Sequence, residues 1–573
     1  MLKRFTLLAA SGLLLAGCAT SAPVSETSVA STPSPSVGAV SAADPRAEDA
    51  GMAMLQQGGS SVDAAIATML ALTVVEPQSS GIGGGGFLVR GTPGGVVESF
   101  DGRETAPAGA TPEWFLNDDG SLPPFGDSVR SGLSVGVPGN IALAALAHEK
   151  HGKLPWAKLF EPAIALAREG FVVNRRLHNS LSQSKDRAAK TVSGRELFFT
   201  EAGEPLPVGT LVVNEDLAKT LERIAERGPE EFYEGANAAL LAATVSAATP
   251  RDGAMTEADV TGYEAQLRAP VCGSYREHRI CSMGPPTSGG VAVIQILTQL
   301  ERFDLSALGK DNPVTWHLFL EAQRLAYADR EIYLADSDFI SVPVAGLTDR
   351  DYLAQRSALI SPDARMASVE AGTPEGATTA LADGDEPEEK GTSHFAAVDG
   401  DNVMVSYTST IEGAFGSGLM MGGFYLNNEL TDFSRAPEVD GRLVANRVEG
   451  GKRPRSSMSP TVVWDPEGKP LLMVGAAGGS TIPVQTARSI VGVIDFGLGA
   501  EEALGLPFVM AFGDRVLLEQ GTWLEGAQDA FKALGYGELI LREAPVKANA
   551  ILRDGDSWSS ARDPRLADQV ESP

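Results

Sequence analysis

Thr392 has the surroundings of a nucleophile that is made by cutting the chain. The acidic run EPEEK ends at Gly391, and a strand-like stretch, TSHFAAVD, begins at Thr392. A cut between these two residues would give the threonine a free α-amine. Such an amine, with a pKa of about 8, can take the proton of the neighbouring hydroxyl and turn a weak alcohol into a usable nucleophile.

The residues after Thr392 predict a β-hairpin that brings a second hydroxyl beside it. Alternating residues predict strands over 394–398 and 403–408, joined by the turn signal DGDN. If the turn is centred on its middle Gly–Asp bond, Thr392 faces position 409, and Thr408 or its neighbour lies beside it within a one-residue uncertainty of register. An ordinary cross-strand threonine pair, which contributes roughly a few tenths of a kcal/mol, would show the same pattern.

Mixed helix and strand patterns surround this hairpin and must position it. Ser60 stands three residues before Asp63, which is a capping-box start for a helix over 62–75. Apolar residues at helical or alternating spacing mark further elements along most of the chain. The other predicted helices span 47–57, 141–151, 156–169, 216–226, 291–300 and 314–334, and the other predicted strands span 87–90, 96–100, 461–464 and 471–474.

Composition argues against several classes of function. The 573 residues are 43% hydrophobic, enough for at least one large core, and the net charge of −28 disfavours binding to nucleic-acid phosphates. His148 and His151 occur in HEKH, which lacks the HExxH spacing of a zinc site. We therefore expect no metal, no cofactor and no nucleic-acid partner.

Two short motifs suggest other kinds of site but lack the required context. GIGGGG at 81–86 satisfies the dinucleotide pattern GxGxxG, yet it precedes the strand-like FLVRG instead of opening a helix. GLSVG around Ser134 satisfies the nucleophile-elbow pattern, yet Pro138 and Gly139 follow where a helix should begin. Neither a dinucleotide site nor a hydrolase built on Ser134 is favoured.

The N-terminus predicts export. Two basic residues precede about a dozen mostly apolar residues, too few to span a bilayer, and LAGC ends this stretch at Cys18. The ending resembles a bacterial lipoprotein signal, in which residues 1–18 direct export and Cys18 becomes the lipidated first residue; an ordinary secretory signal is the alternative. Residues 19–43, rich in Ser, Thr and Pro, predict a flexible tether. We expect a periplasmic, lipid-anchored protein, and Ala19 favours the outer membrane.

Two further features concern redox state and a chain boundary. Cys272 and Cys281 flank a predicted hairpin and could form a disulfide in an oxidising compartment, although two free thiols fit the sequence equally well. Residues 370–390 are rich in Gly, Pro, Thr and carboxylates and predict a structureless segment. Inside a folded region, such a segment is typical of a boundary.

From about residue 44 to 550 the chain resembles the γ-glutamyltranspeptidases, a family of N-terminal-nucleophile hydrolases. The motifs that carry the resemblance are, in order, QGGSSVDAAIA, VVEPQSSGIGGGGF, DGRETAP, GLSVGVPG, MGPPTSGG, YADR, GTSHFAAVD, LNNELTDFS, KRPRSSMSPT and GAAGGS. The resemblance implies an α+β fold, a four-layer αββα sandwich formed jointly by two subunits. It also implies self-cleavage between Gly391 and Thr392, which gives a large subunit of residues 44–391 after the tether and a small catalytic subunit of residues 392–573.

The resemblance assigns the chemistry around the nucleophile. Thr392 would be the nucleophile and, through its amine, the base, and Thr408 of YTST would hydrogen-bond it. Gly478 and Gly479 of AAGGS would direct backbone amides at the oxyanion of the tetrahedral intermediate. Such donors each lower the barrier by about 3–4 kcal/mol, and glycine lets the backbone approach closely.

The resemblance also assigns the pocket for a glutamyl group, which carries both a carboxylate and an ammonium. Arg103, with Ser456 and Ser457, would bind the carboxylate, because a guanidinium fork pairs with two oxygens. Glu429 and Asp432 would bind the ammonium. The alternatives without a substrate are a surface ion pair, ordinary turn hydroxyls and a solvated acidic loop.

Two features bear on the size and shape of the substrate. Many of these transpeptidases have Asn two residues after the threonine matched by Thr408, where it helps to bind the glutamyl group. This chain has Thr410 there, so one pocket contact is altered. Residues 434–455 occupy the place of the lid that covers the substrate, which favours a closed site for a small molecule.

Together these observations predict a self-processing γ-glutamyltransferase and hydrolase. Thr392 would attack the γ-amide of glutathione or a related γ-glutamyl compound and pass the glutamyl group to water or to an amino acid or dipeptide acceptor. The first alternative is a glutaryl or cephalosporin acylase of the same superfamily, which Glu429 and Asp432 argue against. The second is a lipid-anchored binding protein that has lost catalysis.

Overall fold

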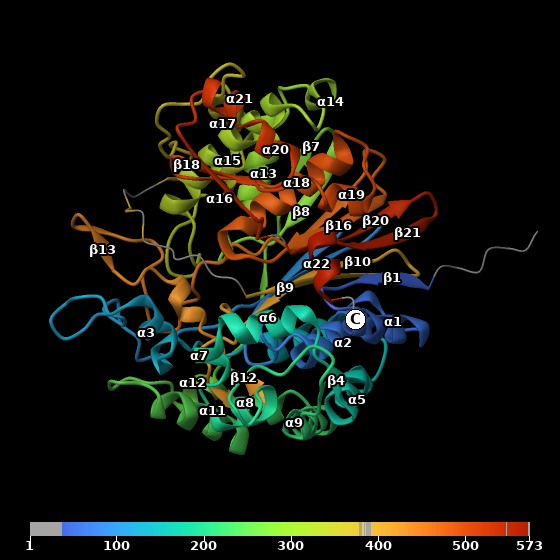
Figure 1. Cartoon of the computed structure of the whole chain (residues 1–573), viewed down its shortest axis with the longest axis vertical. Coiled ribbons are helices and arrows are strands. Elements are labelled where there is room, and N and C mark those ends of the chain that lie inside the picture. Colours follow the sequence, from blue (N-terminus) through green and yellow to red (C-terminus); the bar gives the residue numbers. More distant parts are fainter. Residues whose placement is uncertain (1–36, 378–380, 383, 385–390, 546, 571–573) are drawn as a thin grey trace, which may run out of the picture. The chain divides into compact units, whose positions relative to one another are not determined.

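Thr392 lies at the start of one of two antiparallel, six-stranded sheets that form the centre of the described residues (Figure 1). The computed structural model describes residues 37–377, 381–382, 384, 391–545 and 547–570. In spatial order the first sheet consists of β1 (Gly38–Ser41), β9 (Ser393–Asp399), β10 (Met404–Thr410), β2 (Gly85–Gly91), β3 (Val97–Gly102) and β6 (Gln266–Arg268). The second consists of β21 (Ser557–Arg562), β20 (Ala548–Asp554), β16 (Pro470–Ala476), β15 (Thr461–Trp464), β8 (His278–Ser282) and β7 (Val271–Tyr275).

Helices cover the outer face of each sheet, which gives four layers in the order αββα (Figure 1). On the first sheet lie α1 (Pro45–Gln56), α2 (Ser61–Val75) and α4 (Asn140–His151). On the second lie α13 (Gly289–Leu300) and α18 (Ile482–Ile494), and α15 (Pro313–Tyr333) packs against α13. Strands β9 and β10 of one sheet contact β16 and β20 of the other. The predicted four-layer architecture is therefore confirmed.

Smaller elements flank these layers. The described residues also form the 3-10 helices η1 (Gly132–Ser134), η2 (Trp156–Phe160), η3 (Glu429–Asp432) and η4 (Gly479–Thr481). The remaining strands are β4 (Phe171–Val172), β5 (Leu211–Val212), β11 (Met420–Met421), β12 (Phe424–Tyr425), β13 (Glu438–Val439), β14 (Arg442–Leu443), β17 (Val509–Phe512), β18 (Arg515–Glu519) and β19 (Glu538–Arg542). The remaining α-helices are α3 (Phe125–Val129), α5 (Glu161–Glu169), α6 (Arg175–Gln183), α7 (Lys185–Ala188), α8 (Val192–Phe198), α9 (Glu215–Arg227), α10 (Glu230–Tyr233), α11 (Gly235–Ala247), α12 (Glu257–Thr261), α14 (Leu305–Leu308), α16 (Val344–Leu347), α17 (Arg350–Ser357), α19 (Ala500–Leu504), α20 (Trp523–Gly526), α21 (Gln528–Ala533) and α22 (Pro564–Val570).

Helix α2 begins where its sequence predicts. The Ser60 side chain accepts from the Asp63 amide, and the Asp63 side chain accepts from the Ser60 amide, which is the predicted capping box. Every residue of α2 is buried, as expected for a helix that is apolar on all sides. The buried helix packs against β9 and β10 and so supports the hairpin.

The β9–β10 hairpin forms, but its register differs by one residue from the prediction. Ser393 pairs with Ser409, and His394 pairs with Thr408, so Thr392 stands opposite Thr410 instead of position 409. The cause is Asn402, whose φ of 58° extends the connection to three residues. Connections that end in a left-handed residue are common in hairpins of this length.

The predicted tether ends earlier than residue 43. Residues 38–41 form β1, an edge strand paired with β9 in the first sheet, because GAVSA is apolar enough to be buried there. The predicted signal peptide, Cys18 and most of the tether lie outside the described residues. Among the residues described, none of the helices combines the length and apolar character needed to cross a membrane.

The predicted structureless segment 370–390 lies partly in the described chain. Residues 370–377 carry no helix or strand there, whereas Ala382 is buried and forms a bridge with Val444. The remainder of the prediction falls on residues outside the described ranges. The prediction of a boundary near 390 is not tested by this local structure.

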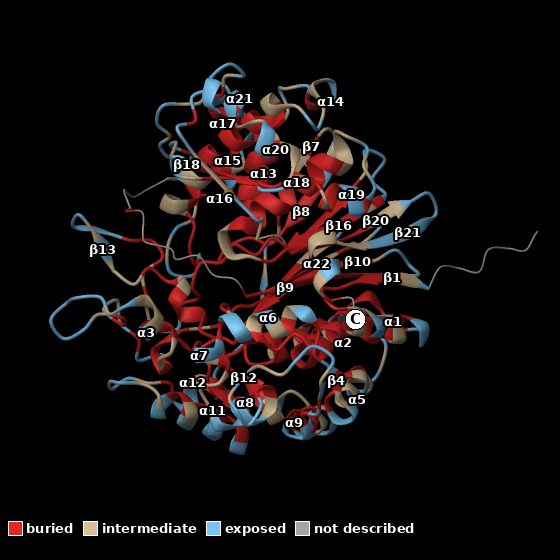
Figure 2. Ribbon diagram, viewed as in Figure 1, coloured by how far each residue is buried: buried red, intermediate tan, exposed pale blue. Residues whose placement is uncertain are grey.

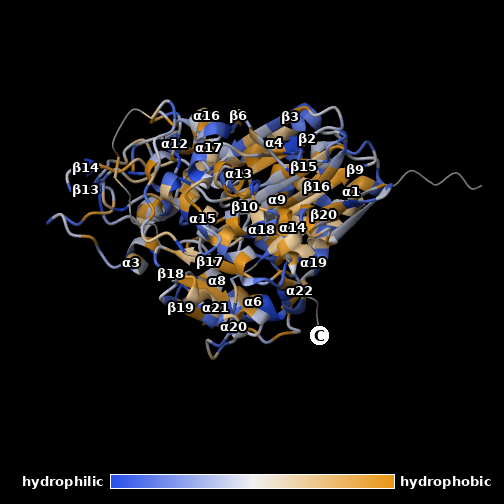
Figure 3. Ribbon diagram, turned by 90° about the horizontal axis from the view of Figure 1, so that it is seen from above, coloured by the Kyte–Doolittle hydropathy of each residue, from blue (hydrophilic) through white to orange (hydrophobic). Residues whose placement is uncertain are grey.

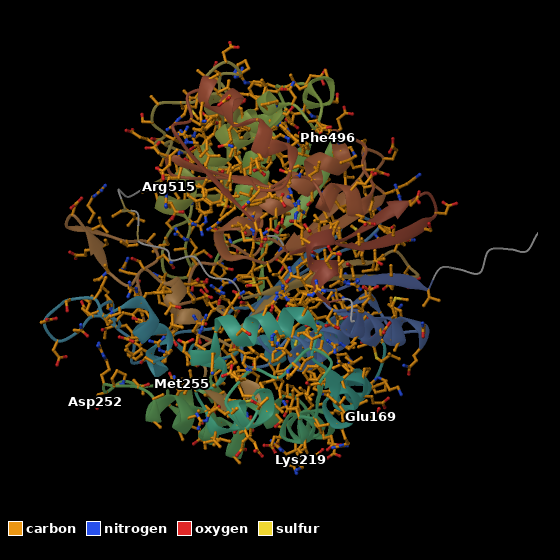
Figure 4. All side chains as sticks on the ribbon, in the orientation of Figure 1. Glu169, Lys219, Asp252, Met255, Phe496 and Arg515 are labelled. Carbon is orange, nitrogen blue, oxygen red and sulfur yellow. A yellow bond between two sulfur atoms is a disulfide. The ribbon has the colours of Figure 1, made fainter. Side chains whose placement is uncertain are left out.

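Buried apolar residues of two clusters form the core between the layers. Figure 2 shows the buried residues concentrated in the central elements, and Figure 3 shows that many residues there are hydrophobic. One cluster joins the first helix layer to its sheet, and a second joins the two sheets to the helices above them. Charged side chains such as those of Glu169 and Lys219 project from outer helices (Figure 4). Cys272 and Cys281, opposite each other on β7 and β8, form a disulfide, which decides between the two redox states that the sequence left open.

Candidate active site

Thr392 immediately precedes β9, and its side chain contacts Thr410 across the hairpin. The Thr392 hydroxyl donates to the Thr410 hydroxyl over 3.0 Å, and both residues are buried. The Thr392 amide donates to the carbonyl oxygen of Ser79 at 2.7 Å. The hydroxyl and the nitrogen that would become the α-amine therefore both have fixed partners, as an N-terminal nucleophile requires.

The prediction that Thr408 hydrogen-bonds Thr392 is wrong. The Thr408 hydroxyl lies 2.9 Å from Nδ1 of His394, its partner in the hairpin register. Directly opposed residues in an antiparallel pair share a face, and the observed register places Thr410, instead of position 409, opposite Thr392. Burial lowers the pKa of His394 to about 3, so this imidazole stays neutral.

The backbone on both sides of the predicted scissile bond is tightly constrained. A Cβ atom on Gly391 would lie 1.8 Å from the carbonyl oxygen of Glu412, so glycine alone fits there. Thr392 has a φ of 84°, in the left-handed region that β-branched residues rarely adopt. Local backbone strain of this kind concentrates at functional sites, where the surrounding structure maintains it.

Arg103 lies at the centre of an acidic cluster built from distant segments. It directly follows β3, and its guanidinium donates to Glu429 and to Asp432, both on the 3-10 helix η3. Glu104 Oε2 lies 4.0 Å from Arg103 Nη1. The remaining guanidinium contacts are to backbone carbonyl oxygens of residues 454–455, at 3.1 and 3.0 Å. The predicted carboxylate-binding and ammonium-binding residues are thus brought together as direct ion pairs.

The acidic cluster contains three carboxyl groups around one guanidinium. Burial raises the pKa values of Glu104 and Glu429, while Arg103 opposes this shift and Asp432 adds to it. Burial by itself would lower the pKa of Arg103, but the three carboxyl groups hold it above its ordinary value. The carboxyl groups thus outnumber the cationic group, and their oxygens can accept hydrogen bonds from an ammonium group.

Most predicted site residues line one small pocket. Its lining residues are Arg103, Thr392, Thr410, Glu412, Glu429, Asp432, Ser456, Ser457, Met458, Gly479, Ser480 and Ile482. Thr408 and Gly478, which were predicted to belong to the site, are not among them. The nucleophile, the acidic cluster and the two serines therefore line the same pocket.

The two predicted serines differ in how firmly they are held. The Ser457 hydroxyl accepts from Arg330 Nη2 at 2.7 Å, and the Ser456 hydroxyl accepts from the Met458 amide at 3.1 Å. Arg330 Nε also donates to the Ser288 hydroxyl at 2.8 Å. Arg330 therefore holds the Ser457 hydroxyl by a hydrogen bond, a contact that the sequence did not predict.

Gly478 and Gly479 form the turn between β16 and α18. Their φ angles, 121° and 55°, lie in the region that favours glycine, and Gly479 begins the 3-10 helix η4, which leads into α18. Amides at such a helix start point away from the helix and favour negative charge. Gly479 lines the cavity, so its position fits the predicted oxyanion role, whereas Gly478 lies one residue further from it.

Residues 434–455, predicted to be a lid, pack against the acidic cluster. The Asn446 side-chain amide donates to the carbonyl oxygen of Asp432 at 2.6 Å, and Lys452 and Arg453 are buried. The segment includes the short hairpin strands β13 and β14. These contacts hold η3 in place, and the role of a lid stays a prediction.

Sequence reasoning missed a buried polar cluster on the other side of Thr392. It consists of Glu76, Ser79, Ser393 and Lys547. Glu76 and Ser79 stand inside VVEPQSSGIGGGGF, one of the motifs that carry the family resemblance, which offered a signal. Nothing in the sequence around Lys547 marks it, because its neighbours in the cluster come from other parts of the chain.

Three comparisons relate this chain to known proteins. The family model described as gamma-glutamyltranspeptidase matches residues 47–572. The glutathione hydrolase proenzyme of Escherichia coli (strain K12) is 37% identical over 546 residues, which cover 93% of this chain and 91% of that protein. A cephalosporin acylase structure from Bacillus halodurans superposes with a TM-score of 0.79 at 28% identity, covering 94% of this chain and 97% of that one. A γ-glutamyltranspeptidase structure from Helicobacter pylori has a TM-score of 0.56 at 37% identity, covering 58% of this chain and 95% of that one.

Proposed function

The chain belongs to the γ-glutamyltranspeptidase family, and from this premise we propose that it is a self-processing γ-glutamyltransferase and glutathione hydrolase. The observation that carries the proposal is that Thr392 lines the same pocket as Arg103 and the carboxylates paired with it. Its substrates would be glutathione and related γ-glutamyl compounds, with water, amino acids or dipeptides as acceptors.

Self-processing would use the same hydroxyl. Thr392 Oγ1 attacks the carbonyl carbon of Gly391, the Gly391–Thr392 C–N bond breaks, and the nitrogen takes the hydroxyl proton and becomes the α-amine. Water then hydrolyses the resulting ester, which leaves a carboxylate on Gly391 and frees the Thr392 hydroxyl. The close contact at Gly391 and the positive φ of Thr392 support this site for the cut.

The two products would remain associated because they share a sheet. Strands β9 and β10 of the segment 392–573 pair with β1 and β2 of the segment before Gly391. Cleavage removes one peptide bond and none of these ladder hydrogen bonds. We therefore propose a large subunit ending at residue 391 and a small subunit beginning at residue 392, held together by the sandwich.

Turnover would follow the same logic on a γ-glutamyl amide. The α-amine of Thr392 takes the hydroxyl proton as Oγ1 attacks the γ-carbonyl carbon, and the amine then gives that proton to the departing amino group. Backbone amides at Gly478 and Gly479 would stabilise the oxyanion. Water or an acceptor amine attacks the acyl-enzyme ester in the second half, with the α-amine again accepting the proton.

The acidic cluster favours a glutamyl over a glutaryl substrate. A glutaryl group has no ammonium, so it would leave the carboxyl groups around Arg103 without an ammonium partner. In this structure the terminal nitrogens of Arg103 already pair with Glu429 and Asp432. A glutamyl group would bring a carboxylate for the guanidinium and an ammonium for the carboxylates together, which keeps the cluster paired.

Two measurements test the proposal. Two bands on a denaturing gel, with the smaller one beginning at Thr392 by N-terminal sequencing, would establish processing, and Thr392→Ala should leave one uncut chain. Ser134→Ala, which removes the hydroxyl of the rejected elbow motif, should process normally. Release from γ-glutamyl and glutaryl anilides should then be measured side by side. A preference for the glutaryl compound would replace the assignment by an acylase such as the one that superposes on this fold.

The N-terminal sequence motivates a proposal about location. We place the mature protein in the periplasm, lipid-anchored through Cys18 after removal of residues 1–17, with the outer membrane favoured. Cys18→Ser should move the protein from the membrane to the soluble periplasmic fraction without changing its specific activity. A variant that still sediments with membranes would contradict the lipid anchor.

A further inference from the structure

Lys547 lies directly behind the nucleophile and contacts its backbone. Its ammonium donates to the carbonyl oxygen of Thr392 at 2.5 Å and to the Ser393 hydroxyl at 3.1 Å. It also donates to Glu76 Oε2 at 3.0 Å and to the Ser79 hydroxyl at 3.1 Å. Lys547 is 5% exposed, so water competes little for these contacts.

The partners of Lys547 are themselves held by other bonds. The Ser393 hydroxyl donates to Glu76 Oε2 at 2.6 Å, and Arg176 Nε donates to Glu76 Oε1 at 2.7 Å. The carbonyl oxygen of Ser79 accepts the amide of the nucleophile. Ser79, in the loop after α2, therefore holds the nucleophile at its amide, and Lys547, just before β20, holds it at its carbonyl group.

The charge of Lys547 matters to this arrangement. An ammonium offers three donors to the four acceptors around it, whereas a neutral amine offers two. Burial and, to a smaller extent, Arg176 lower the pKa of Lys547 to about 7, and Glu76 opposes the shift. Burial likewise opposes ionisation of Glu76, but Lys547 and Arg176 bring the pKa of Glu76 down to about 2. Within the described residues, the charged groups that face Lys547 are therefore Glu76 and Arg176.

Building on the proposed function, we propose that Lys547 is a positioning residue for the N-terminal nucleophile. Its ammonium holds the Thr392 carbonyl group, and through it orients the hydroxyl and the new α-amine toward the cavity. A positive charge beside that amine also disfavours the protonated form, which cannot act as a base. Lys547 thus keeps the base in its working state without touching the substrate.

The test compares two matched substitutions in the small subunit. Lys547→Met keeps an apolar stem of similar length and removes the charge, and Lys532→Met makes the same change at an exposed lysine on α21. We expect Lys547→Met to slow self-cleavage and to lower kcat on a γ-glutamyl anilide by about tenfold or more, with KM within about threefold. The acid limb of kcat/KM should move up by about one pH unit, because the α-amine then binds a proton more easily. Lys532→Met should match the unmodified chain in all four measurements.

A second variant separates positioning from structural support. Lys547→Arg keeps the positive charge, so its acid limb should stay at the pH of the unmodified chain even where the larger head group lowers kcat. An acid limb that moves in Lys547→Arg, or a folded Lys547→Met with unchanged kcat and unchanged limb, would overturn the proposal. An unmodified chain that cuts itself but does not hydrolyse γ-glutamyl anilides would instead refute the substrate assignment. The role of Lys547 would then still be tested by comparing the self-cleavage rate of Lys547→Met with that of the unmodified chain.

Discussion

Thr410→Val should damage the nucleophile far more than Thr408→Val. Valine has nearly the shape of threonine, so the change removes a hydroxyl and little else. In the structure the Thr410 hydroxyl accepts from the Thr392 hydroxyl at 3.0 Å and from the Glu412 amide at 2.7 Å. The Thr408 hydroxyl instead faces His394. The two variants therefore compare two hydroxyls on the same face of one strand, of which one touches the nucleophile.

The size of the effect follows from burial. Leaving a buried polar group without its partner costs about 1–3 kcal/mol, and about 1.4 kcal/mol changes a rate tenfold. If the bond from Thr392 to Thr410 orients the attacking oxygen in the transition state, Thr410→Val should lower kcat by about 5- to 150-fold. Thr408→Val should lower the free energy of unfolding by about 1–2 kcal/mol through His394, with kcat within about threefold of the unmodified chain.

Initial rates of anilide release from a γ-glutamyl anilide measure kcat and KM, and a time course on a denaturing gel measures self-cleavage. Urea titration of each variant separates loss of stability from loss of activity. Equal losses of kcat in the two variants, or a larger loss in Thr408→Val, would refute the register and the role that we assign to Thr410. A Thr410→Val enzyme with kcat within about threefold of the unmodified chain would refute the role alone.

Three further predictions follow from the site. Gly391→Ala should slow self-cleavage by about tenfold or more on a gel, because its Cβ would lie 1.8 Å from the Glu412 carbonyl oxygen; normal processing would contradict the tight fit. Glu429→Gln and Asp432→Asn should each raise KM for a γ-glutamyl anilide by about 10- to 100-fold while improving relative activity on the glutaryl anilide, since charged hydrogen bonds contribute about 1.5–3 kcal/mol; unchanged selectivity would argue against ammonium binding there. Glu76 has a folded pKa of about 2, below its ordinary 4.5, so its contribution of about 3 kcal/mol is present above pH 4.5 and is lost as pH falls toward 2. Urea titrations between pH 6 and pH 3 should therefore show a flatter decline in Glu76→Gln than in the unmodified chain, and parallel declines would show that Glu76 is not ion-paired.

Local patterns predicted much of the fold because they depend on neighbouring residues. The capping box at Ser60 placed the start of α2 within one residue, and alternation along 394–398 placed β9 within one residue at each end. The four residues GAVS of β1 were predicted to be part of the tether, because so short a run carries too little periodicity to indicate an edge strand. What made it a strand is its partner β9, some 350 residues away along the chain.

The site was predicted less evenly, for a related reason. The family resemblance predicted that Arg103, Glu429 and Asp432 share one pocket. In the structure Arg103 forms direct ion pairs with both acidic residues. The close pairing of Arg103 with several carboxyl groups depends on burial, which a sequence motif does not specify. The sequence did not predict a role for Lys547, because the four oxygen atoms that it contacts belong to other segments of the chain.

The sequence by itself determined the family and the four-layer fold, and it predicts where the chain is cut, because each depends on residues that stand together along the chain. Only the tertiary structure decided which hydroxyl touches Thr392. The turn residue Asn402 shifts the register by one residue, which puts Thr410 instead of position 409 opposite Thr392, and propensity does not resolve a shift of this size. The structure also decided what lies behind the nucleophile, since long-range packing alone places the ammonium of Lys547 against the Thr392 carbonyl.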